Sequence, residues 1–190
     1  MLLLVGLGNP GSNYTNTRHN IGFKIIDAIN SHFKLSKQKP KFKGLLTTGN
    51  IDEKKIYAIK PLTFMNNSGT AIKELIDYFK IDAKDVFVFH DDMDIDFGKI
   101  KTKFGGGSAG HNGIESIDKF IGKDYSRVRI VIGHPKQKKK VNNHVLEDFK
   151  DDEEEKINEI TENIVKQLPT LIKKKIDLFS SKVNQELNGI

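Results

Sequence analysis

Apolar residues recur along the chain at two spacings, which predict alternating strands and helices. Residues 2–5 form a short apolar run that ends at Gly6, a pattern typical of a buried strand. Between residues 21 and 33 the apolar side chains return every three or four positions, as they do on the buried face of a helix. Residues 86–89 predict a second buried strand.

Two later segments alternate strictly between apolar and polar side chains, as strands with one buried face do. Residues 99–104 predict a strand with three lysines on one face, and residues 127–132 predict a strand whose two arginines point outward. These five cations are Lys99, Lys101, Lys103, Arg127 and Arg129. Alternate residues of a strand lie about 6.7 Å apart, so the lysines form a cationic row comparable to the phosphates of a nucleic-acid strand.

The interleaving of strands and helices predicts an α/β fold. We expect a single-domain sandwich over residues 1–190, in which helices flank a central twisted mixed sheet. The sheet is predicted to be mixed because two adjacent strands precede the second helix. Further strands are expected at residues 42–48 and 55–59 around a turn at residues 49–52, and further helices at residues 72–79, at residues 114–121 and on either side of Pro169.

Composition narrows the class of protein. A chain of 190 residues fits one domain. The absence of cysteine excludes a disulfide scaffold, an iron–sulfur cluster, a thiolate zinc site and a thiol nucleophile, and it favours the reducing cytoplasm. No apolar run approaches the roughly 20 residues that span a bilayer. We therefore expect a soluble cytoplasmic protein without a membrane partner.

Charge is unevenly distributed along the sequence. Residues 147–162 contain nine acids and two lysines, a local charge of −7, which leaves +13 for the rest of a chain whose net charge is +6. A segregated positive surface predicts an anionic partner, above all nucleic acid. A cluster of lysines in a loop, Lys136, Lys138, Lys139 and Lys140, would add to this surface or be only a solvated loop.

A glycine pattern follows the first strand. Residues 6–11 satisfy the spacing G-x-G-x-x-G of dinucleotide-binding turns. A polar loop rather than a helix follows them, Pro10 removes an amide donor, and no acidic residue ends a second strand about 20 residues later. A dinucleotide site is therefore disfavoured, and the glycines are interpreted as a turn that holds Asn9.

Polar side chains stand where strands are predicted to lead into helices. Asn9, His19, Asn66, Asp91 and Asn112 all occupy such positions. Because ligands of open α/β sheets gather at the carboxyl ends of strands, these residues could face one crevice. Each has a simpler alternative: Asn66, Asn67, Ser68 or Asn112 could cap a helix, His19 and His111 could be ordinary residues at helix starts, and Asp91 or Asp92 could anchor a turn.

The chemistry of this set favours hydrolysis by water. A histidine with a pKa near 6.5 can accept a proton at neutral pH, and a carboxylate on its other nitrogen stabilises the imidazolium. Carboxamides can orient a carbonyl or stabilise an oxyanion. There is no serine elbow and no cysteine to act as nucleophile, which points to ester or amide hydrolysis without a covalent intermediate. No zinc motif such as H-E-x-x-H is present, so we expect no metal and no cofactor.

Five separated blocks of sequence, in order, resemble the bacterial peptidyl-tRNA hydrolases. The resemblance extends to about residue 149 and implies a monomeric enzyme that hydrolyses the ester between a peptide and the 3′-terminal ribose of tRNA. The blocks are residues 5–11 with Tyr14 and residues 17–20, residues 61–69, residues 90–94, residues 105–113, and residues 127–129 with residues 133–135.

The resemblance also implies roles for individual residues. His19 corresponds to the catalytic base and Asp91 to the carboxylate that orients it. Lys103 and Arg129 correspond to the clamp on the terminal phosphate of the tRNA acceptor end. The residues that would position the peptide, the water or the oxyanion, or line the crevice, are Asn9, Tyr14, Met65, Asn66 and Asn112. The alternative classes are a non-catalytic RNA-binding module on the same fold and a dinucleotide-dependent enzyme.

Overall fold

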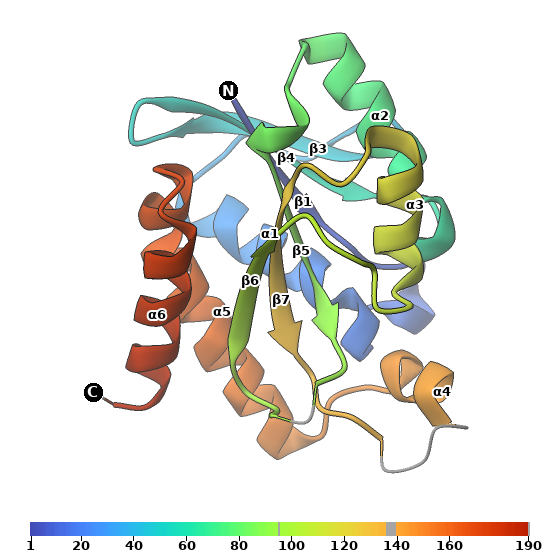
Figure 1. The fold of residues 1–190 in the computed structure, drawn as a ribbon, viewed down its shortest axis with the longest axis vertical. Coiled ribbons are helices and arrows are strands. Elements are labelled where there is room, and N and C mark those ends of the chain that lie inside the picture. Colours follow the sequence, from blue (N-terminus) through green and yellow to red (C-terminus); the bar gives the residue numbers. More distant parts are fainter. Residues whose placement is uncertain (95, 136–139, 190) are drawn as a thin grey trace.

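The central feature is one sheet of seven strands in the order β2-β3-β4-β1-β5-β7-β6 (Figure 1). The computed structural model describes residues 1–94, 96–135 and 140–189. Strands β4, β1, β5 and β7 run parallel, whereas the outer pairs are antiparallel, so the predicted mixed sheet is confirmed. The strands are β1 (Leu2–Gly6), β2 (Lys39–Lys41), β3 (Gly44–Ile51), β4 (Lys54–Pro61), β5 (Val86–Asp92), β6 (Ile100–Phe104) and β7 (Ser126–Val131).

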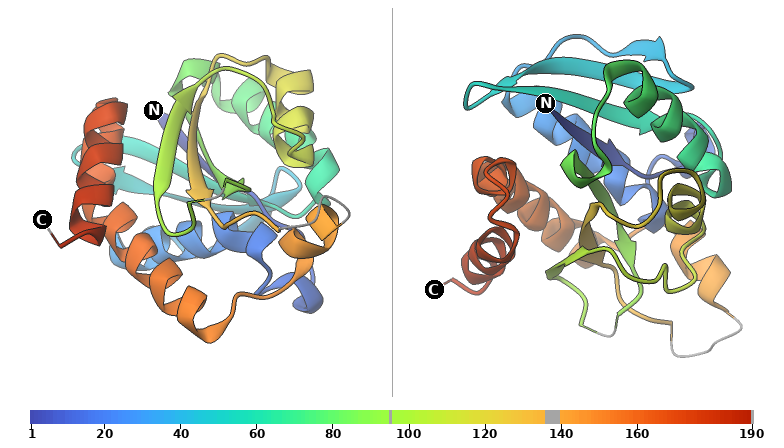
Figure 2. Two further views of the ribbon diagram at one scale, coloured as in Figure 1. Left: turned by 60° about the horizontal axis from the view of Figure 1, so that its bottom comes forward. Right: turned by 45° about the horizontal axis from the view of Figure 1, so that its top comes forward.

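Helices cover both faces of the sheet, as the left view of Figure 2 shows. Helices α1, α5 and α6 pack on one face, and α2 and α3 pack on the other. None of the helices in the described ranges has the length and apolar character needed to span a bilayer. The helices are α1 (Ile21–His32), α2 (Ser68–Phe79), α3 (Asn112–Ile121), α4 (Val141–Leu146), α5 (Asp151–Ile172) and α6 (Ile176–Leu187), with 3₁₀ turns η1 (Ser12–Tyr14), η2 (Arg18–Asn20), η3 (Met65–Asn67) and η4 (Ala83–Asp85).

Strand β1 contributes to the hydrophobic core on each side of the sheet. Leu2 and Leu4 pack toward α1, α5 and α6, while Leu3 and Val5 pack toward α2 and α3. All four side chains are buried because a parallel central strand is covered on both faces. This burial explains why the strand is a continuous apolar run rather than an alternating one.

Two glycines let helix α1 touch the backbone of the sheet. A Cβ atom on Gly22 would lie 2.3 Å from the backbone nitrogen of Leu7 and 2.5 Å from the carbonyl oxygen of Phe89. A Cβ on Gly6 would lie 2.2 Å from the carbonyl oxygen of Gly22. No other residue type fits at such a contact. The close approach brings η2, which directly precedes α1, to the carboxyl ends of β1 and β5.

The turn between β3 and β4 lies later than predicted. Residues 49–51 belong to β3, and the chain reverses at Asp52 and Glu53, whose φ angles are 45° and 64°. Two consecutive positive φ angles are those of a two-residue hairpin turn of type I′. The expected turn at residues 49–52 was therefore wrong, because glycine and asparagine in a strand resemble turn residues.

The two predicted C-terminal helices are present, but the break between them lies after Pro169 and not at it. Helix α5 continues through Pro169 to Ile172, and the chain leaves the helix at residues 173–175. Pro169 lies in the last turn, where its ring removes only one hydrogen bond, and its carbonyl still accepts one from the backbone nitrogen of Lys173 at 3.3 Å. Lys174, with a φ of 59°, adopts the left-handed conformation common where helices end.

Candidate active site

The two residues predicted to be catalytic meet at the carboxyl end of the central strands. His19 lies in η2 and Asp91 lies near the end of β5. The Nδ1 atom of His19 is 2.8 Å from Oδ1 and 2.9 Å from Oδ2 of Asp91, although the residues are 72 positions apart. Both are buried, with 8% and 2% of their surfaces exposed. With Nδ1 on the carboxylate, the Nε2 atom of His19 is the nitrogen left to take a proton.

A second histidine shares the same carboxylate. The Nδ1 atom of His111 accepts hydrogen bonds from the backbone nitrogens of Gly113 at 3.1 Å and Ile114 at 3.3 Å, so it caps α3. Because Nδ1 is an acceptor, the proton of the neutral ring lies on Nε2, which donates to Oδ1 of Asp91 at 2.9 Å. From the sequence, His111 was expected only as a residue at the start of a helix, without a role in the site.

Electrostatics at the carboxylate favour a charged Asp91. Burial alone would raise the pKa of Asp91, but the charges of His19 and His111 and their hydrogen bonds hold this pKa well below its usual range. Burial likewise opposes a charge on His19, yet the charge of Asp91 and its hydrogen bond outweigh this effect and raise the pKa of His19 above 6.5. The pair is therefore built to stabilise an imidazolium once His19 has accepted a proton.

A third histidine lies beneath this pair. His90 is 5% exposed, its Nδ1 atom donates to the carbonyl oxygen of Asp91 at 2.7 Å, and its ring meets that of His111 edge to face at 4.8 Å. Burial, followed by the charge of His111, holds the pKa of His90 well below 6.5, so the ring is neutral. The Nε2 atom of His90 has no hydrogen-bond partner within the described ranges.

Asn9 is held by hydrogen bonds from two directions. The side chain of Asn20 accepts from the backbone nitrogen of Asn9 and donates to its carbonyl oxygen, both at 2.9 Å. The Oδ1 atom of Asn9 accepts from the backbone nitrogen of Met65 at 2.8 Å. Within the described part of the chain, no hydrogen bond involves the Nδ2 group of Asn9. Asn20 is a positioning residue that sequence reasoning missed, because a buried asparagine looks the same in sequence as an exposed one.

The other predicted binding residues lie on neighbouring elements. Asn66 is exposed on η3, and Asn112 is exposed at the first position of α3, the helix against which η3 packs. Neither residue caps a helix: the N-cap of α2 is Asn67, which makes no capping hydrogen bond, and that of α3 is His111. The capping alternative for these two asparagines was therefore wrong. Met65 is buried and Tyr14 is half-buried at the end of η1.

A cavity of about 280 Å³ joins the histidine cluster to the predicted phosphate clamp. His19 and Asp91 line it together with Lys103 and Arg129, and α4 contributes a further wall. Arg129 forms an ion pair with Asp92 at 2.6 Å. We call this space, lined by His19, Asp91, His111, Lys103 and Arg129, the active-site cavity.

Most cations of the predicted row already have partners within the protein. Lys99 pairs with Asp96 at 2.8 Å and Lys101 pairs with Asp94. Arg127, expected to point to solvent, is buried, because α3 and the loop of residues 105–111 cover this face of β7. Its guanidinium donates to Asp118 and to the carbonyl oxygens of Gly106 and Gly107, so it supports the loop. Of the predicted lysine patch, Lys136, Lys138 and Lys139 lie outside the described residues.

The histidine cluster also contains the ligand types of a transition-metal site. One nitrogen of His19, one of His111 and a carboxylate oxygen of Asp91 lie within 4.8 Å of one another. Imidazole and carboxylate groups bind zinc and similar ions. His19 and His111 each already hydrogen-bond to Asp91, so an ion held by the same nitrogens would have to displace these bonds.

Comparisons with known proteins agree on one family. The family model described as peptidyl-tRNA hydrolase matches residues 3–189. A protein of Pelagibacter ubique named peptidyl-tRNA hydrolase is 69% identical over 186 residues, which are 98% of this chain and 100% of that protein. Its namesake in Ehrlichia canis is 45% identical over 97% of this chain and 95% of that protein. The crystal structure of peptidyl-tRNA hydrolase from Acinetobacter baumannii superposes with a TM-score of 0.91 at 34% identity, covering 97% of this chain and 94% of that chain.

Proposed function

Because this chain belongs to the peptidyl-tRNA hydrolase family, we propose that its histidine cluster cleaves the ester between a peptide and the 3′-terminal ribose of tRNA. The proposal includes substrates that carry an N-blocked aminoacyl group in place of a peptide. The observation that supports this chemistry best is the 2.8 Å contact between His19 Nδ1 and Asp91, in the cavity that also contains Lys103 and Arg129. The product is free tRNA, which returns to translation.

In this mechanism His19 is the general base. Its Nε2 atom takes a proton from a water molecule, whose oxygen attacks the carbonyl carbon of the ester. The Asp91 carboxylate, bound to Nδ1, stabilises the imidazolium that forms. When the tetrahedral intermediate collapses, the bond from carbon to the ribose oxygen breaks, and the imidazolium returns its proton to that oxygen. A peptide carboxylic acid and a ribose hydroxyl result.

The carboxamides position the reacting groups. The Nδ2 group of Asn9 is free to donate because Met65 occupies the Oδ1 atom. Asn66 and Asn112 present exposed amides from the adjacent η3 and α3. Amide donors of this kind can hold the ester carbonyl and the oxyanion, each contributing on the order of 3 kcal/mol to the transition state. Tyr14 and Met65 would line the crevice beside them.

Lys103 and Arg129 would bind the terminal phosphate of the tRNA. Both line the active-site cavity, and guanidinium and ammonium groups are suited to phosphate oxygens. Arg129 would then exchange or share its ion pair with Asp92. The remaining parts of the proposal are that residues 1–190 form one domain and that the enzyme acts as a monomer in the cytoplasm, with no cofactor.

Hydrolysis in oxygen-18-labelled water tests this mechanism. With N-acetyl-leucyl-tRNA as substrate, mass spectrometry should find one labelled oxygen in the released carboxylate and none in the tRNA, because water attacks the carbonyl carbon. Heat-inactivated enzyme provides the background. Label in the ribose, or an acyl group that remains on the protein after an acid quench, would contradict the proposed attack by water.

A further inference from the structure

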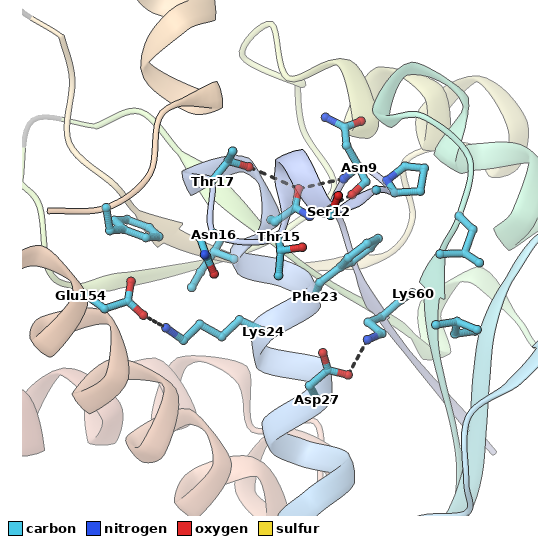
Figure 3. A pocket seen from close by; sticks show the side chains of 17 residues that line it. Asn9, Ser12, Thr15, Asn16, Thr17, Phe23, Lys24, Asp27, Lys60 and Glu154 are labelled. Atoms are coloured by element: carbon cyan, nitrogen blue, oxygen red, sulfur yellow. Dashed lines mark hydrogen bonds and ion pairs between the residues drawn. The ribbon is translucent and has the colours of Figure 1, made fainter. Parts of the chain in front are cut away.

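The three carboxamides of the proposed site differ in the residue that follows each of them. Asn9, which lines a cavity over α1 (Figure 3), precedes Pro10, whose ring nitrogen carries no hydrogen. Asn66 precedes a second asparagine, whereas Asn112 precedes Gly113. The backbone nitrogen of the following residue can attack the side-chain amide of an asparagine, and a glycine hinders this attack least because it has no side chain. Asn112 is therefore the most labile carboxamide of the three.

The packing of α3 on η3 depends on a glycine at position 113. A Cβ atom on Gly113 would lie 2.6 Å from the sulfur of Met65 and 2.9 Å from Cδ1 of Leu7. Both of these side chains are buried, so neither can turn aside into solvent. A larger residue would have to push η3 away from α3. The proposed chemistry uses a carboxamide at position 112 and the packing uses a glycine at position 113, so the labile pair lies within the site.

His111 holds the nitrogen atom that would make the attack. Its Nδ1 atom accepts a hydrogen bond from the backbone nitrogen of Gly113 at 3.1 Å and another from that of Ile114 at 3.3 Å. Asn112 is the first residue of α3, so its backbone is helical. For the attack, the Gly113 nitrogen must lose its proton and reach the side-chain carbon Cγ of Asn112. Both the helical backbone and the hydrogen bond to His111 oppose this movement.

We propose that Asn112 is a site of spontaneous deamidation and that the cap formed by His111 controls its rate. When the first turn of α3 opens, the Gly113 nitrogen forms a bond to Cγ of Asn112. The bond from Cγ to Nδ2 breaks, and the amide group leaves as ammonia with the proton of the backbone nitrogen. Water then opens the resulting five-membered ring at either carbonyl carbon, which leaves aspartate or isoaspartate at position 112. The reaction needs only water.

Deamidation would change the chemistry of the active-site cavity. Asn112 and Asp91 both line this cavity. The product replaces a carboxamide, which can donate a hydrogen bond, by a second carboxylate, which cannot donate and repels an oxyanion. This consequence rests on the proposed function, whereas the deamidation itself does not. The cap of α3 thus preserves a group that the proposed reaction uses.

Incubation of the purified protein in oxygen-18-labelled water at pH 8 and 37 °C tests the proposal. Peptide mass spectrometry gives the rate at which label enters each asparagine. Asn188 is an internal reference, because it is exposed, precedes Gly189 and lies at the end of α6. We expect Asn188 to react about tenfold faster than Asn112 in the wild type, because helix ends open more easily than packed turns. Equal rates at the two asparagines would overturn the proposal.

Two substitutions separate the cap from the other contacts of His111. Both His111→Ala and His111→Ser remove the imidazole and its bond to Asp91, but serine can cap α3 and alanine cannot. We expect Asn112 to react about fivefold faster in His111→Ala than in the wild type, and His111→Ser to stay close to the wild type. The rate at Asn188 should be the same in all three proteins. Equal rates at Asn112 in the two variants would overturn the role of the cap.

A second measurement replaces these variants if His111→Ala does not fold. In the wild type at urea concentrations below the unfolding transition, the opening that frees the Gly113 nitrogen also exposes it to solvent. The deamidation rate of Asn112 should therefore rise in proportion to amide hydrogen exchange at Gly113. Deamidation that does not follow this exchange would overturn the proposal.

The effect on activity is measured separately from the deamidation. Asn112→Asp reproduces one of the two products, and we expect it to hydrolyse N-acetyl-leucyl-tRNA about 10²-fold more slowly than the wild type. Full activity of Asn112→Asp would contradict the effect on the site. A wild type that hydrolyses no ester would contradict the proposed function instead, because the label at position 112 is measured without reference to activity.

Discussion

The Asp91 carboxylate accepts hydrogen bonds from two imidazoles, and the two rings are held differently. The ring of His111 is fixed by the start of α3, whereas His19 lies in a 3₁₀ turn with Nε2 free of the carboxylate. One histidine is therefore suited to orient the acid and the other to exchange a proton. This division of roles makes separate predictions for Asp91, His19 and His111.

The pH dependence of catalysis should report the pKa of His19. In the proposed mechanism the active form has a neutral His19, and Asp91 raises the pKa of that ring, so kcat/KM should rise with pH through a midpoint above 6.5. His90 and His111 also face the carboxylate, and His90 stays neutral throughout.

Asp91→Asn removes the charge that raises the pKa of His19 and leaves burial, which lowers this pKa. The midpoint should therefore move to lower pH, and the plateau should fall by about 10²- to 10⁴-fold. A midpoint that does not move would contradict the assigned pair.

Two substitutions of His111 separate its structural role from its effect on Asp91. Asparagine can cap α3 but is too short to replace the hydrogen bond from His111 Nε2 to the Asp91 carboxylate. Alanine provides neither the cap nor this hydrogen bond. His111→Asn should unfold with about 1 kcal/mol more free energy than His111→Ala, as measured by urea denaturation. Both variants should lose about tenfold in kcat, because each removes a hydrogen bond to a charged acceptor. Recovery of kcat along with stability in His111→Asn would mean that His111 acts only as a cap.

At the level of residues, sequence reasoning found the chemically distinctive groups. Asp91 stands near the end of β5 and His19 directly before α1, positions that in an open α/β sheet can face one crevice, and the family resemblance assigned their roles. His111 and Asn20 act through hydrogen bonds whose partners depend on the exact three-dimensional arrangement. The same limit explains Arg127, since the strand alternation gave its face correctly but not that α3 covers this face.

At the level of elements, the contact between α1 and the sheet decides where His19 lies. Gly22→Ala would place a methyl group within 2.5 Å of backbone atoms of β5 and of the loop after β1, which cannot move like side chains. Inside a helix alanine is more favourable than glycine by about 1 kcal/mol. Helix propensity alone would therefore predict that Gly22→Ala stabilises the protein, and only the close contact with the sheet predicts that it destabilises it. We expect the free energy of unfolding to fall by about 1–3 kcal/mol.

A matched control exists for this prediction. An alanine Cβ at Gly107 would have no heavy atom within 4 Å, so Gly107→Ala should change the free energy of unfolding by less than about 0.5 kcal/mol. Both variants can be compared by urea denaturation. A stability of Gly22→Ala equal to that of the wild type would show that α1 can shift away from the sheet without loss.

The order and type of most elements followed from apolar spacing, but their boundaries depended on details that spacing does not contain. Helix α5 passes Pro169 because the proline falls in the last turn, where one missing amide matters little. The hairpin turn lies at Asp52 and Glu53, neither of which is glycine, although both have positive φ. Strand β2, with three exposed residues, has no apolar pattern at all and was not predicted.

At the level of the whole molecule, the acidic segment has a structural explanation. Its acids begin helix α5, where negative charge favours the helix N-terminus, and Glu153 and Glu154 pair with Arg18 and Lys24. These pairs join α5 to the turn that contains His19 and to α1. These ion pairs neutralise part of the negative charge of the acidic segment, and the rest of the chain keeps its net positive charge.

The salt dependence of tRNA binding should distinguish bound from distant cations. Lys103→Ala and Arg129→Ala should each weaken binding of substrate and reduce the slope of log K against log salt by about one, because each phosphate contact releases counterions. Lys166→Ala is the control, since it removes the same charge from an exposed site on α5, where Lys166 pairs with Glu186. If all three variants have the same slope, the lysine and the arginine affect binding only through the net charge of the protein, and the phosphate clamp is contradicted.

The central claim is that His19, held by Asp91, activates water without help from a metal. The most direct measurement is the single-turnover rate on N-acetyl-leucyl-tRNA, at pH 8 in the presence of a chelator, for the wild type and for His19→Ala. Circular dichroism would confirm that both are folded. We expect the chelated wild type to hydrolyse the ester and the variant to be slower by about 10²- to 10⁴-fold. Hydrolysis by folded His19→Ala at the wild-type rate, or loss of wild-type activity in the chelator that is restored by added metal, would contradict the claim.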